Sequence, residues 1–279
     1  MNLRGGGMKR QRGFTLIELL VALGIFLLVI GAAFTLLSTS QQRYRTESQV
    51  LNSFQEARLG MDQIVRDIND AGFPPPSFAN VDPARVTTAP FGWQPGYTVP
   101  SPCQIGATCF TPADFDIIIE TEPNPVDPAC FPSCKVQWIR YQLGGPNGTT
   151  LMRAAVDKQA PSHDPAVDTS GVLVPFVENV VNNSPNLQIG QFQLSVAYPA
   201  VFPGGNPVPI FQYTCEQPSV FPPPSPLPLC VNAGPDNSPL NIRDVAITLI
   251  VADPSPDAVT GRPRLVQLEG RGRRINPNQ

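Results

Sequence analysis

The pattern of apolar and polar positions sets residues 14–37 apart from the rest of the chain. Glu18 is the only charged residue among these 24 positions, and most of the others are apolar. An α-helix rises about 1.5 Å per residue, so a segment of this length spans the roughly 30 Å hydrocarbon core of a membrane. The sequence therefore predicts a membrane-embedded helical segment over residues 14–37.

The helical pattern continues through residues 38–72 with a different distribution of apolar side chains. Apolar residues recur there at alternating spacings of four and three, which places them on one stripe of a helix. No proline precedes Pro74, and Gly72 followed by Pro74–Pro76 predicts the end of the helix. We expect one continuous helix over residues 14–71, whose second half packs on its own domain. The stripe comprises Val50, Phe54, Ala57, Met61, Ile64, Ile68 and Ala71.

Beyond Gly72 the pattern changes to short β-branched and alternating runs separated by turn residues. Residues 144–148 join two of these runs and predict a hairpin, whereas residues 172–181 fit either a strand or a short helix. Residues 199–239 contain 12 prolines, so we interpret them as an extended surface insertion rather than a central strand. The expected strands are residues 115–119, 136–143, 149–155, 187–198, 242–251 and 264–269.

These elements predict an α+β fold, in which a long N-terminal helix packs on an antiparallel β-sheet domain with Pro-rich loops. A shift in composition near Gly72, after which all the prolines occur, marks the start of the domain. The expected divisions are a leader at 1–13, a transmembrane half of the helix at 14–37, an amphipathic half at 38–72 and an exported β-rich globular domain at 73–279, with the Pro-rich insertion at 199–239.

The distribution of charge predicts the orientation of the chain in a membrane. Basic side chains at Arg4, Lys9, Arg10 and Arg12 precede the apolar segment, and such a flank stays on the cytoplasmic side. We therefore expect a single-pass protein of the bacterial inner membrane with an exported C-terminal domain. The formal net charge of −3 argues against a general nucleic-acid binder.

All six cysteines follow the membrane segment, in the part expected in an oxidising compartment where disulfides form. The sequence does not fix their connectivity. We favour pairs that are sequential along the chain, because the members of each pair are close and flanked by turn residues. A zinc site is disfavoured because His163 is the only histidine. The candidate disulfide residues are Cys103, Cys109, Cys130, Cys134, Cys215 and Cys230.

The junction between the basic leader and the apolar segment reads Gly13-Phe14-Thr15-Leu16-Ile17-Glu18. It resembles the processing site of the type IV prepilin family, the pilins and the secretion pseudopilins, and the resemblance covers residues 13–38. It implies that the prepilin peptidase cuts after Gly13 and N-methylates Phe14. It also implies that Glu18 acts in assembly with other minor and major pilins or pseudopilins. Many major pilins bend this helix at a proline, and none occurs here before Pro74.

The chemistry of Glu18 supports the same role independently. A carboxylate within an apolar segment is costly and usually has a partner. Cleavage after Gly13 would give Phe14 a free α-amine, which is cationic at pH 7. In a filament, Glu18 of one subunit can meet the α-amine of a neighbour. Because both groups are desolvated, the pair selects the register between subunits more than it stabilises them.

The exported part resembles one group within this family more closely. Residues 66–73 and the order of the segments 138–141, 151–153, 177–180 and 245–249 are similar to minor pilins of the PilW type, although Asn69 and Phe73 depart from the pattern. J-type minor pseudopilins of type II secretion systems are the related alternative. Both would leave the inner membrane lipid to initiate or cap a pilus or pseudopilus. A competing hypothesis is a pilus-tip binding module that contacts DNA or a surface.

The sequence predicts no enzyme, no cofactor and no metal. Ser162, His163 and Asp164 are consecutive, whereas the members of a catalytic triad come from distant segments. The acidic residues do not have the spacing of a calcium-binding loop. The pairs considered for calcium are Asp164 with Asp168 and Asp236 with Asn237.

The C-terminus is rich in arginine. Arg271, Arg273 and Arg274 form a candidate basic patch for DNA or an acidic partner. A solvated last strand and tail explain the same residues more simply, given a net acidic domain. We therefore expect nucleic acid not to be a partner.

Overall fold

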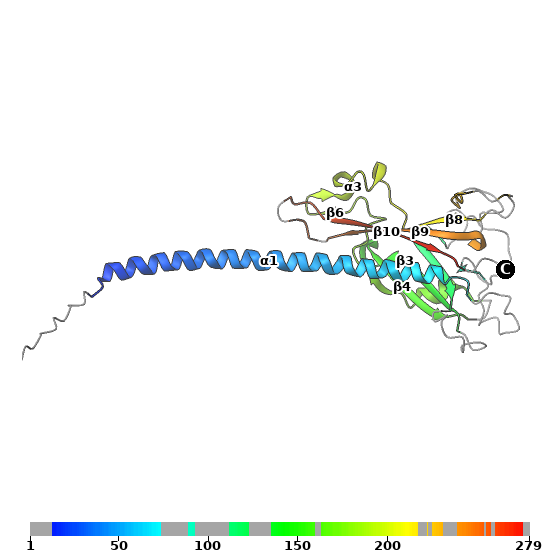
Figure 1. The fold of residues 1–279 in the computed structure, drawn as a ribbon, viewed down its shortest axis with the longest axis horizontal. Coiled ribbons are helices and arrows are strands. Elements are labelled where there is room, and N and C mark those ends of the chain that lie inside the picture. Colours follow the sequence, from blue (N-terminus) through cyan, green and yellow to red (C-terminus); the bar gives the residue numbers. More distant parts are fainter. Residues whose placement is uncertain are drawn as a thin grey trace, which may run out of the picture. The chain divides into compact units, whose positions relative to one another are not determined.

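The computed structural model describes residues 13–73, 89–92, 112–122, 135–159, 163–216, 222, 225–230, 239–253, 255–257 and 260–275. The chain divides into two units, residues 1–49 and residues 50–279, and each is described by itself. The helix α1 (Leu16–Asn69) contributes to both units (Figure 1). The second unit is an antiparallel β domain, so the predicted α+β fold is confirmed.

The helix begins and ends within about one turn of the predicted residues. It ends where Gly72 takes a left-handed backbone conformation with φ +84°, which a residue with a side chain rarely adopts. The N–H of Gly72 donates to the carbonyl of Glu120 and so fixes the chain against the first sheet. The predicted apolar stripe faces the core of the second unit. All of its residues are buried except Phe54, which is partly buried and packs on the same core.

The first sheet has five antiparallel strands in the order β1-β2-β3-β4-β5. The hairpin β3–β4 is confirmed, and its turn is the short helix η4 (Pro146–Gly148). The ambiguous segment 172–181 contains the edge strand β5, which follows the helix α2 (Pro165–Ser170). The strands are β1 (Phe91–Gly92), β2 (Asp116–Thr121), β3 (Gln137–Gly144), β4 (Thr150–Asp157) and β5 (Val174–Val177).

The second sheet has three antiparallel strands in the order β10-β9-β8. The predicted final pair of strands is confirmed as β9 and β10, with Leu268 opposite Leu249. A separate two-stranded ribbon joins β6 and β7. The bounds are β8 (Phe211–Cys215), β9 (Ile242–Ala252), β10 (Leu265–Arg273), β6 (Gln188–Ile189), β7 (Phe192–Gln193), α3 (Leu194–Ala197), η5 (Pro203–Gly205) and η6 (Pro239–Asn241).

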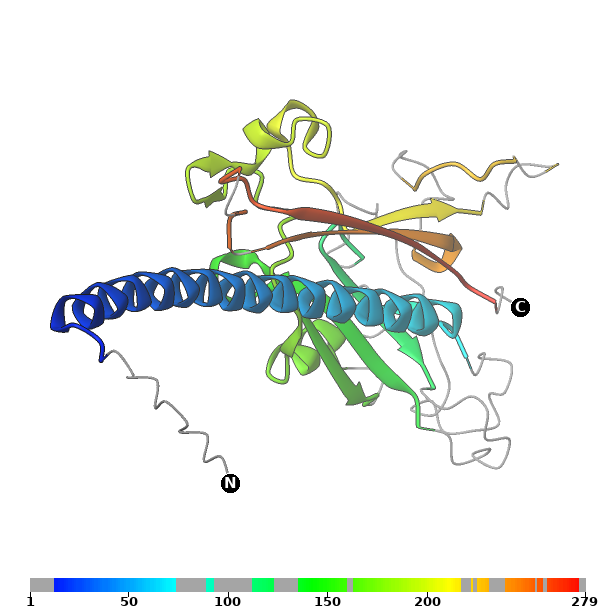
Figure 2. The same cartoon turned by 60° about the vertical axis from the view of Figure 1, so that its left-hand side comes forward.

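Within the second unit, the end of α1 packs closely on strands of both sheets (Figure 2). Glycines make this approach possible. A Cβ on Gly60 would lie 2.5 Å from a side-chain atom of Val177 on β5, and a Cβ on Gly272 of β10 would lie 2.5 Å from Ile68. Contacts this short do not occur between real side chains, so only glycine allows the backbones to come so near.

A buried polar cluster ties α1 to the first sheet. The hydroxyl of Tyr141 donates to Asp67 over 2.5 Å, and the Arg153 guanidinium donates to the Tyr141 hydroxyl over 3.1 Å. Burial, with the nearby carboxylate of Asp67, raises the pKa of Tyr141 far above its ordinary value, so the phenol stays protonated and donates. The Asp67 carboxylate also accepts from Gln63 one turn earlier. The cluster fixes the rotation of α1 about its own axis.

Two predictions from the pattern need correction. Residues 187–198 were expected to form one strand, but Gly190 reverses the chain with φ +62°, so that Phe192 pairs back onto Ile189. The segment 199–239 is not wholly a surface insertion, because β8 lies within it and buries Phe211 and Tyr213 in the main core. These five residues contain no proline, and they occupy an edge of the sheet.

Candidate functional site

The residues to which the sequence assigned a role lie at the start of α1, just before the helix and in its first turn. Gly13, Phe14 and Thr15 precede the helix in extended or irregular backbone, and the first helical residue is Leu16. The Phe14 side chain is 88% exposed. A Cβ placed on Gly13 would meet no atom within 4 Å, so the peptide bond between Gly13 and Phe14 is sterically open in the described part of the chain.

Thr15 and Glu18 form a capping box, in which each side chain bonds the backbone of the other. The backbone N–H and the hydroxyl of Thr15 each donate to Glu18 Oε2 over 2.9 Å. The backbone N–H of Glu18 donates in return to Thr15 Oγ1 over 3.3 Å. The first turn of a helix has backbone N–H groups without helical partners, and this arrangement satisfies two of them.

The capping box gives Glu18 a role within its own subunit. Its carboxylate lies in the first turn, where the positive end of the helix dipole favours a negative charge. It also accepts two hydrogen bonds close by in the sequence, which lowers the cost of placing a carboxylate near lipid. The sequence reasoning overlooked Thr15. The signal was present, because Thr15-Leu16-Ile17-Glu18 has the Thr-x-x-Glu spacing of a capping box.

The surface of α1 that follows this turn is apolar. Residues Leu16–Tyr44 are long and apolar enough to cross a membrane, and no part of this segment is buried within the described residues. Three hydroxyls inside the segment bond to carbonyls of the same helix: Thr35 to Ala32 over 2.8 Å, Ser38 to Thr35 over 3.0 Å and Thr39 to Thr35 over 2.8 Å. These polar groups therefore need no water, which suits a lipid environment.

Two of the six candidate cysteines lie within the described residues. Cys215 and Cys230 form a disulfide across 15 residues, the sequential pair favoured for this part of the chain. Both cysteines are buried in the main core. The disulfide ties β8 to the segment that follows it. The other four candidates, Cys103, Cys109, Cys130 and Cys134, lie outside the described residues.

The candidate basic patch is largely committed to contacts within the domain. Arg271 donates to Asp244 on β9 over 2.9 Å, and Arg273 lies 3.7 Å from the other oxygen of the same carboxylate. Arg274 is not part of a solvated tail. It is 1% exposed, it donates to the carbonyl of Leu240, and burial lowers its pKa to about 10. The three arginines do not form one open cationic surface.

The remaining candidates have structural explanations where they are described. Asp164 caps α2 by accepting from the backbone N–H of Ala166, and His163 lies 3.1 Å from Asp168. Ser162, Asp236 and Asn237 lie outside the described residues. Across the described ranges, no group of three or more His, Cys, Asp or Glu side chains is placed to hold a metal ion.

One comparison with known proteins matches the chain, and it covers the site just described. Residues 8–34 match the family model described as the prokaryotic N-terminal methylation motif. The matched segment includes Gly13, Phe14 and the capping box. No curated protein and no solved structure shows a match to the chain. The motif is type IV prepilin-like, and with the exposed apolar helix it supports a membrane-anchored, pilin-like or pseudopilin subunit.

Proposed function

We propose that the chain is a minor pilin of the PilW type, a structural subunit that helps initiate or cap assembly of a type IV pilus. In this role the prepilin peptidase cuts after Gly13 and N-methylates Phe14, and the subunit then leaves the inner membrane for the filament. The observation that carries the proposal is the start of α1, where an open Gly13–Phe14 bond precedes an apolar, uncovered helix that has the Glu18 carboxylate in its first turn.

The apolar face of α1 suggests how neighbouring subunits would pack. Leu51 and Leu59 are 59% and 71% exposed although they follow the membrane-length segment. They are eight residues apart, so they lie near one side of the helix, away from the buried stripe. A neighbouring helix that covers this side would remove apolar surface from water. Both residues thus extend the helix–helix contact expected in a filament into the exported part.

The Cys215–Cys230 disulfide supports an exported second unit. Disulfides persist in oxidising compartments, and the bacterial periplasm is one of them. The wider resemblance to PilW-type minor pilins concerns residues of the core, including Trp138–Tyr141 on β3 and Val245–Leu249 on β9. A minor pseudopilin of a type II secretion system would have the same first turn of α1. The pilus and secretion alternatives therefore differ in the partner subunits rather than in this site.

The test compares Glu18→Ala with Glu47→Ala, which removes an exposed glutamate further along the same helix. We expect both variants to be processed, with mature N-termini at N-methylated Phe14 by mass spectrometry. We expect Glu18→Ala to reduce incorporation into sheared filaments at least about tenfold, because the register-selecting pair is lost. Normal incorporation of Glu18→Ala would refute the assembly role. A mature N-terminus at any other residue would refute the processing role.

The choice between pilus and secretion system needs its own measurement in the producing organism. Deletion of the gene that encodes this chain should reduce the number of surface pili and leave type II secretion of exported enzymes unchanged. Loss of secretion with normal pili would identify the pseudopilin alternative instead.

A further inference from the structure

A short piece of the chain, residues 225–230, lies along the outer edge of β8, and we call it the cover segment. β8 is the last strand of its sheet and pairs with β9 on one side. On the other side, Thr214 of β8 and Leu229 of the cover segment form an isolated antiparallel bridge. The cover segment thus takes the place of a fourth strand beside β8. An edge strand without such a neighbour presents unpaired N–H and C=O groups.

The hydrogen bonds between the cover segment and β8 are few. The N–H of Cys215 donates to the carbonyl of Pro228 over 3.1 Å, and the N–H of Cys230 donates to the carbonyl of Tyr213 over 2.9 Å. Within the described part of the chain, the cover segment makes no other hydrogen bond. Two of its residues, Pro226 and Pro228, have no N–H to donate, so they cannot add a donor to the ladder.

The cover segment also buries little apolar surface. Leu229 is 49% exposed, and Leu227 belongs to none of the hydrophobic clusters of the described residues. Cys230 is the only residue of the segment that is buried. Ordering the backbone of one residue costs at least as much free energy as one hydrogen bond returns. Two hydrogen bonds and one buried side chain are therefore too little to hold the whole segment in place.

The Cys215–Cys230 disulfide supplies the additional attachment, because it joins the end of β8 to the end of the cover segment. β8 itself is held by other contacts. Its five residues pair with β9, and Phe211 and Tyr213 are buried in the main core. The hydroxyl of Tyr213 also donates to the carbonyl of Ala113 over 2.7 Å. The strand is thus fixed without the disulfide, whereas the cover segment is not.

We propose that this disulfide makes closure of the β8 edge depend on oxidation. When both cysteines are reduced, the cover segment leaves β8, while β8 stays paired with β9 and both sheets stay folded. The N–H of Cys215 and the C=O of Tyr213 then lose their partners in the cover segment and face solvent. The proposal goes beyond the proposed function and does not depend on it, because it concerns a single chain outside any filament.

The reaction that closes the edge is a thiol–disulfide exchange. The Cys215 and Cys230 thiols lose two protons and two electrons as the S–S bond forms, and the disulfide of an external oxidant takes them up and becomes two thiols. A dithiol reductant reverses the reaction. Both cysteines are buried once the bond has formed, so a reductant reaches the bond only when the edge opens. Oxidation therefore gives the chain a β8 edge that stays covered.

The test measures backbone amide hydrogen exchange of the full-length chain in detergent micelles, followed residue by residue by NMR. It compares the oxidised chain, the chain reduced with dithiothreitol, and the double variant Cys215→Ala with Cys230→Ala. In the reduced chain and in the double variant, we expect the amides at positions 215 and 230 to exchange at least about tenfold faster, because each loses its acceptor. The amides of β3 and β4 should keep their exchange rates.

Dithiothreitol also acts on the other four cysteines, and the double variant is the control for them. Adding dithiothreitol to this variant should leave exchange at positions 215 and 230 unchanged, because the disulfide between them is already absent. A further rise there would assign the effect to the other cysteines and overturn the proposal. The reduced chain keeps both cysteine side chains, so it decides the outcome if the two substitutions themselves disturb the core.

Two other results would overturn the proposal. Unchanged exchange at positions 215 and 230 after reduction would show that the cover segment stays on β8 without the disulfide. Faster exchange throughout β3 and β4 after reduction would show that the disulfide stabilises the whole second unit rather than one edge. Filament incorporation is not measured in this experiment, so either result leaves the proposed function as it stands.

Discussion

The two halves of α1 share one helical backbone but have opposite relations to their surroundings. In the first half, apolar side chains are exposed on all sides, and Leu20 and Leu28 are 62% and 76% accessible. In the second half, apolar side chains form a single stripe, and Ile64 and Ile68 are fully buried. The second half is therefore a piece of an ordinary globular core. No described residue covers the apolar side chains of the first half, so lipid or neighbouring chains must cover them.

The glycines of α1 show the same difference. A Cβ on Gly24 or Gly31 would meet no described atom within 4 Å, whereas a Cβ on Gly60 would lie 2.5 Å from Val177. Glycine in a helix interior lowers stability, so each of these glycines is explained by the close contact that it permits. Gly60 allows α1 to approach β5 within its own subunit. Gly24 and Gly31 contact no such neighbour among the described residues of their own subunit, so they leave room for a helix of another subunit.

The largest expected effect comes from emptying the buried stripe. Ile64→Ala should lower the free energy of unfolding by about 3 kcal/mol, because it removes a fully buried side chain and leaves a cavity. Leu59→Ala on the exposed side should change it by less than about 0.5 kcal/mol. Urea unfolding of the full chain in detergent, followed by tryptophan fluorescence, measures both. Similar losses for the two variants would contradict the division of the helix into a packed and an open side.

A smaller effect is expected from the polar cluster that fixes the rotation of α1. Asp67→Asn should lower the free energy of unfolding by about 2 kcal/mol, because it removes the charge that accepts from Tyr141 and faces Arg153. Asp62→Asn, at an exposed position five residues earlier, is the matched control and should be neutral. The same unfolding experiment applies. A neutral Asp67→Asn would show that apolar packing alone positions the helix.

The smallest expected effect distinguishes the glycines of the two halves. Gly60→Ala should lower the free energy of unfolding by about 1 kcal/mol, since the clash with Val177 outweighs the better helix propensity of alanine. Gly24→Ala and Gly31→Ala should leave it unchanged or slightly raised. Thermal unfolding of the purified chain, compared among the three variants, provides the measurement. Destabilisation by Gly24→Ala would mean that the first half is packed within its own subunit.

The features that could be predicted from the sequence are those set by residues close in the chain. The stripe from Val50 to Ala71 follows from a spacing of three and four, and the end of the helix follows from Gly72 and the prolines after it. The β3–β4 hairpin follows from two apolar runs around a Gly-rich turn. Gly13, Phe14 and Glu18 form a contiguous motif, so the matched family model lies where the sequence resemblance placed it.

The features that escaped prediction depend on contacts between distant residues. The alternation through residues 187–198 looks like one strand, but a single positive φ at Gly190 folds it back on itself. The prolines around β8 concealed five residues that join the core only because β9 offers a pairing edge. Nothing local in Lys158 indicates that it pairs with buried Glu120, since the register of β2, β3 and β4 brings them together.

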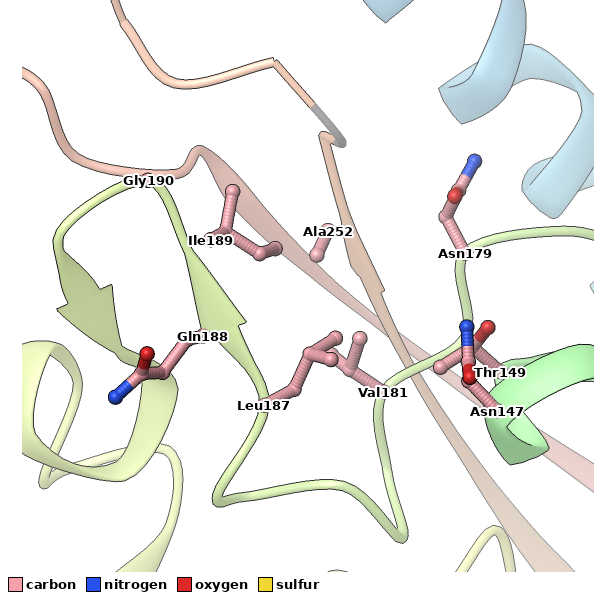
Figure 3. A pocket seen from close by; sticks show the side chains of 9 residues that line it. All are labelled: Asn147, Thr149, Asn179, Val181, Leu187, Gln188, Ile189, Gly190 and Ala252. Atoms are coloured by element: carbon pink, nitrogen blue, oxygen red, sulfur yellow. The ribbon is translucent and has the colours of Figure 1, made fainter.

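A hollow in the second unit, shown in Figure 3, also escaped prediction from the sequence, because residues of the β3–β4 turn, the segment after β5, β6 and β9 line it together. Asn147 lies in a turn and Gln188 in a short ribbon, and each is unremarkable on its own in the sequence. Only the folded chain brings both residues to the lining of one hollow with Val181 and Ile189. Sites made from several loops of a rigid scaffold leave little trace in the linear pattern of residues.

The capping box at Thr15 and Glu18 bears on the time that a subunit spends unassembled. Because Glu18 already accepts two hydrogen bonds within its own chain, a lone subunit can wait in lipid without an unsatisfied carboxylate. In the filament role that we propose, pairing with a neighbour's amine would replace the bonds to Thr15, so Glu18 would be partnered both before and after assembly. If that pair broke, the carboxylate could bond Thr15 again, so a subunit leaving such a filament would not carry an unpartnered charge into lipid.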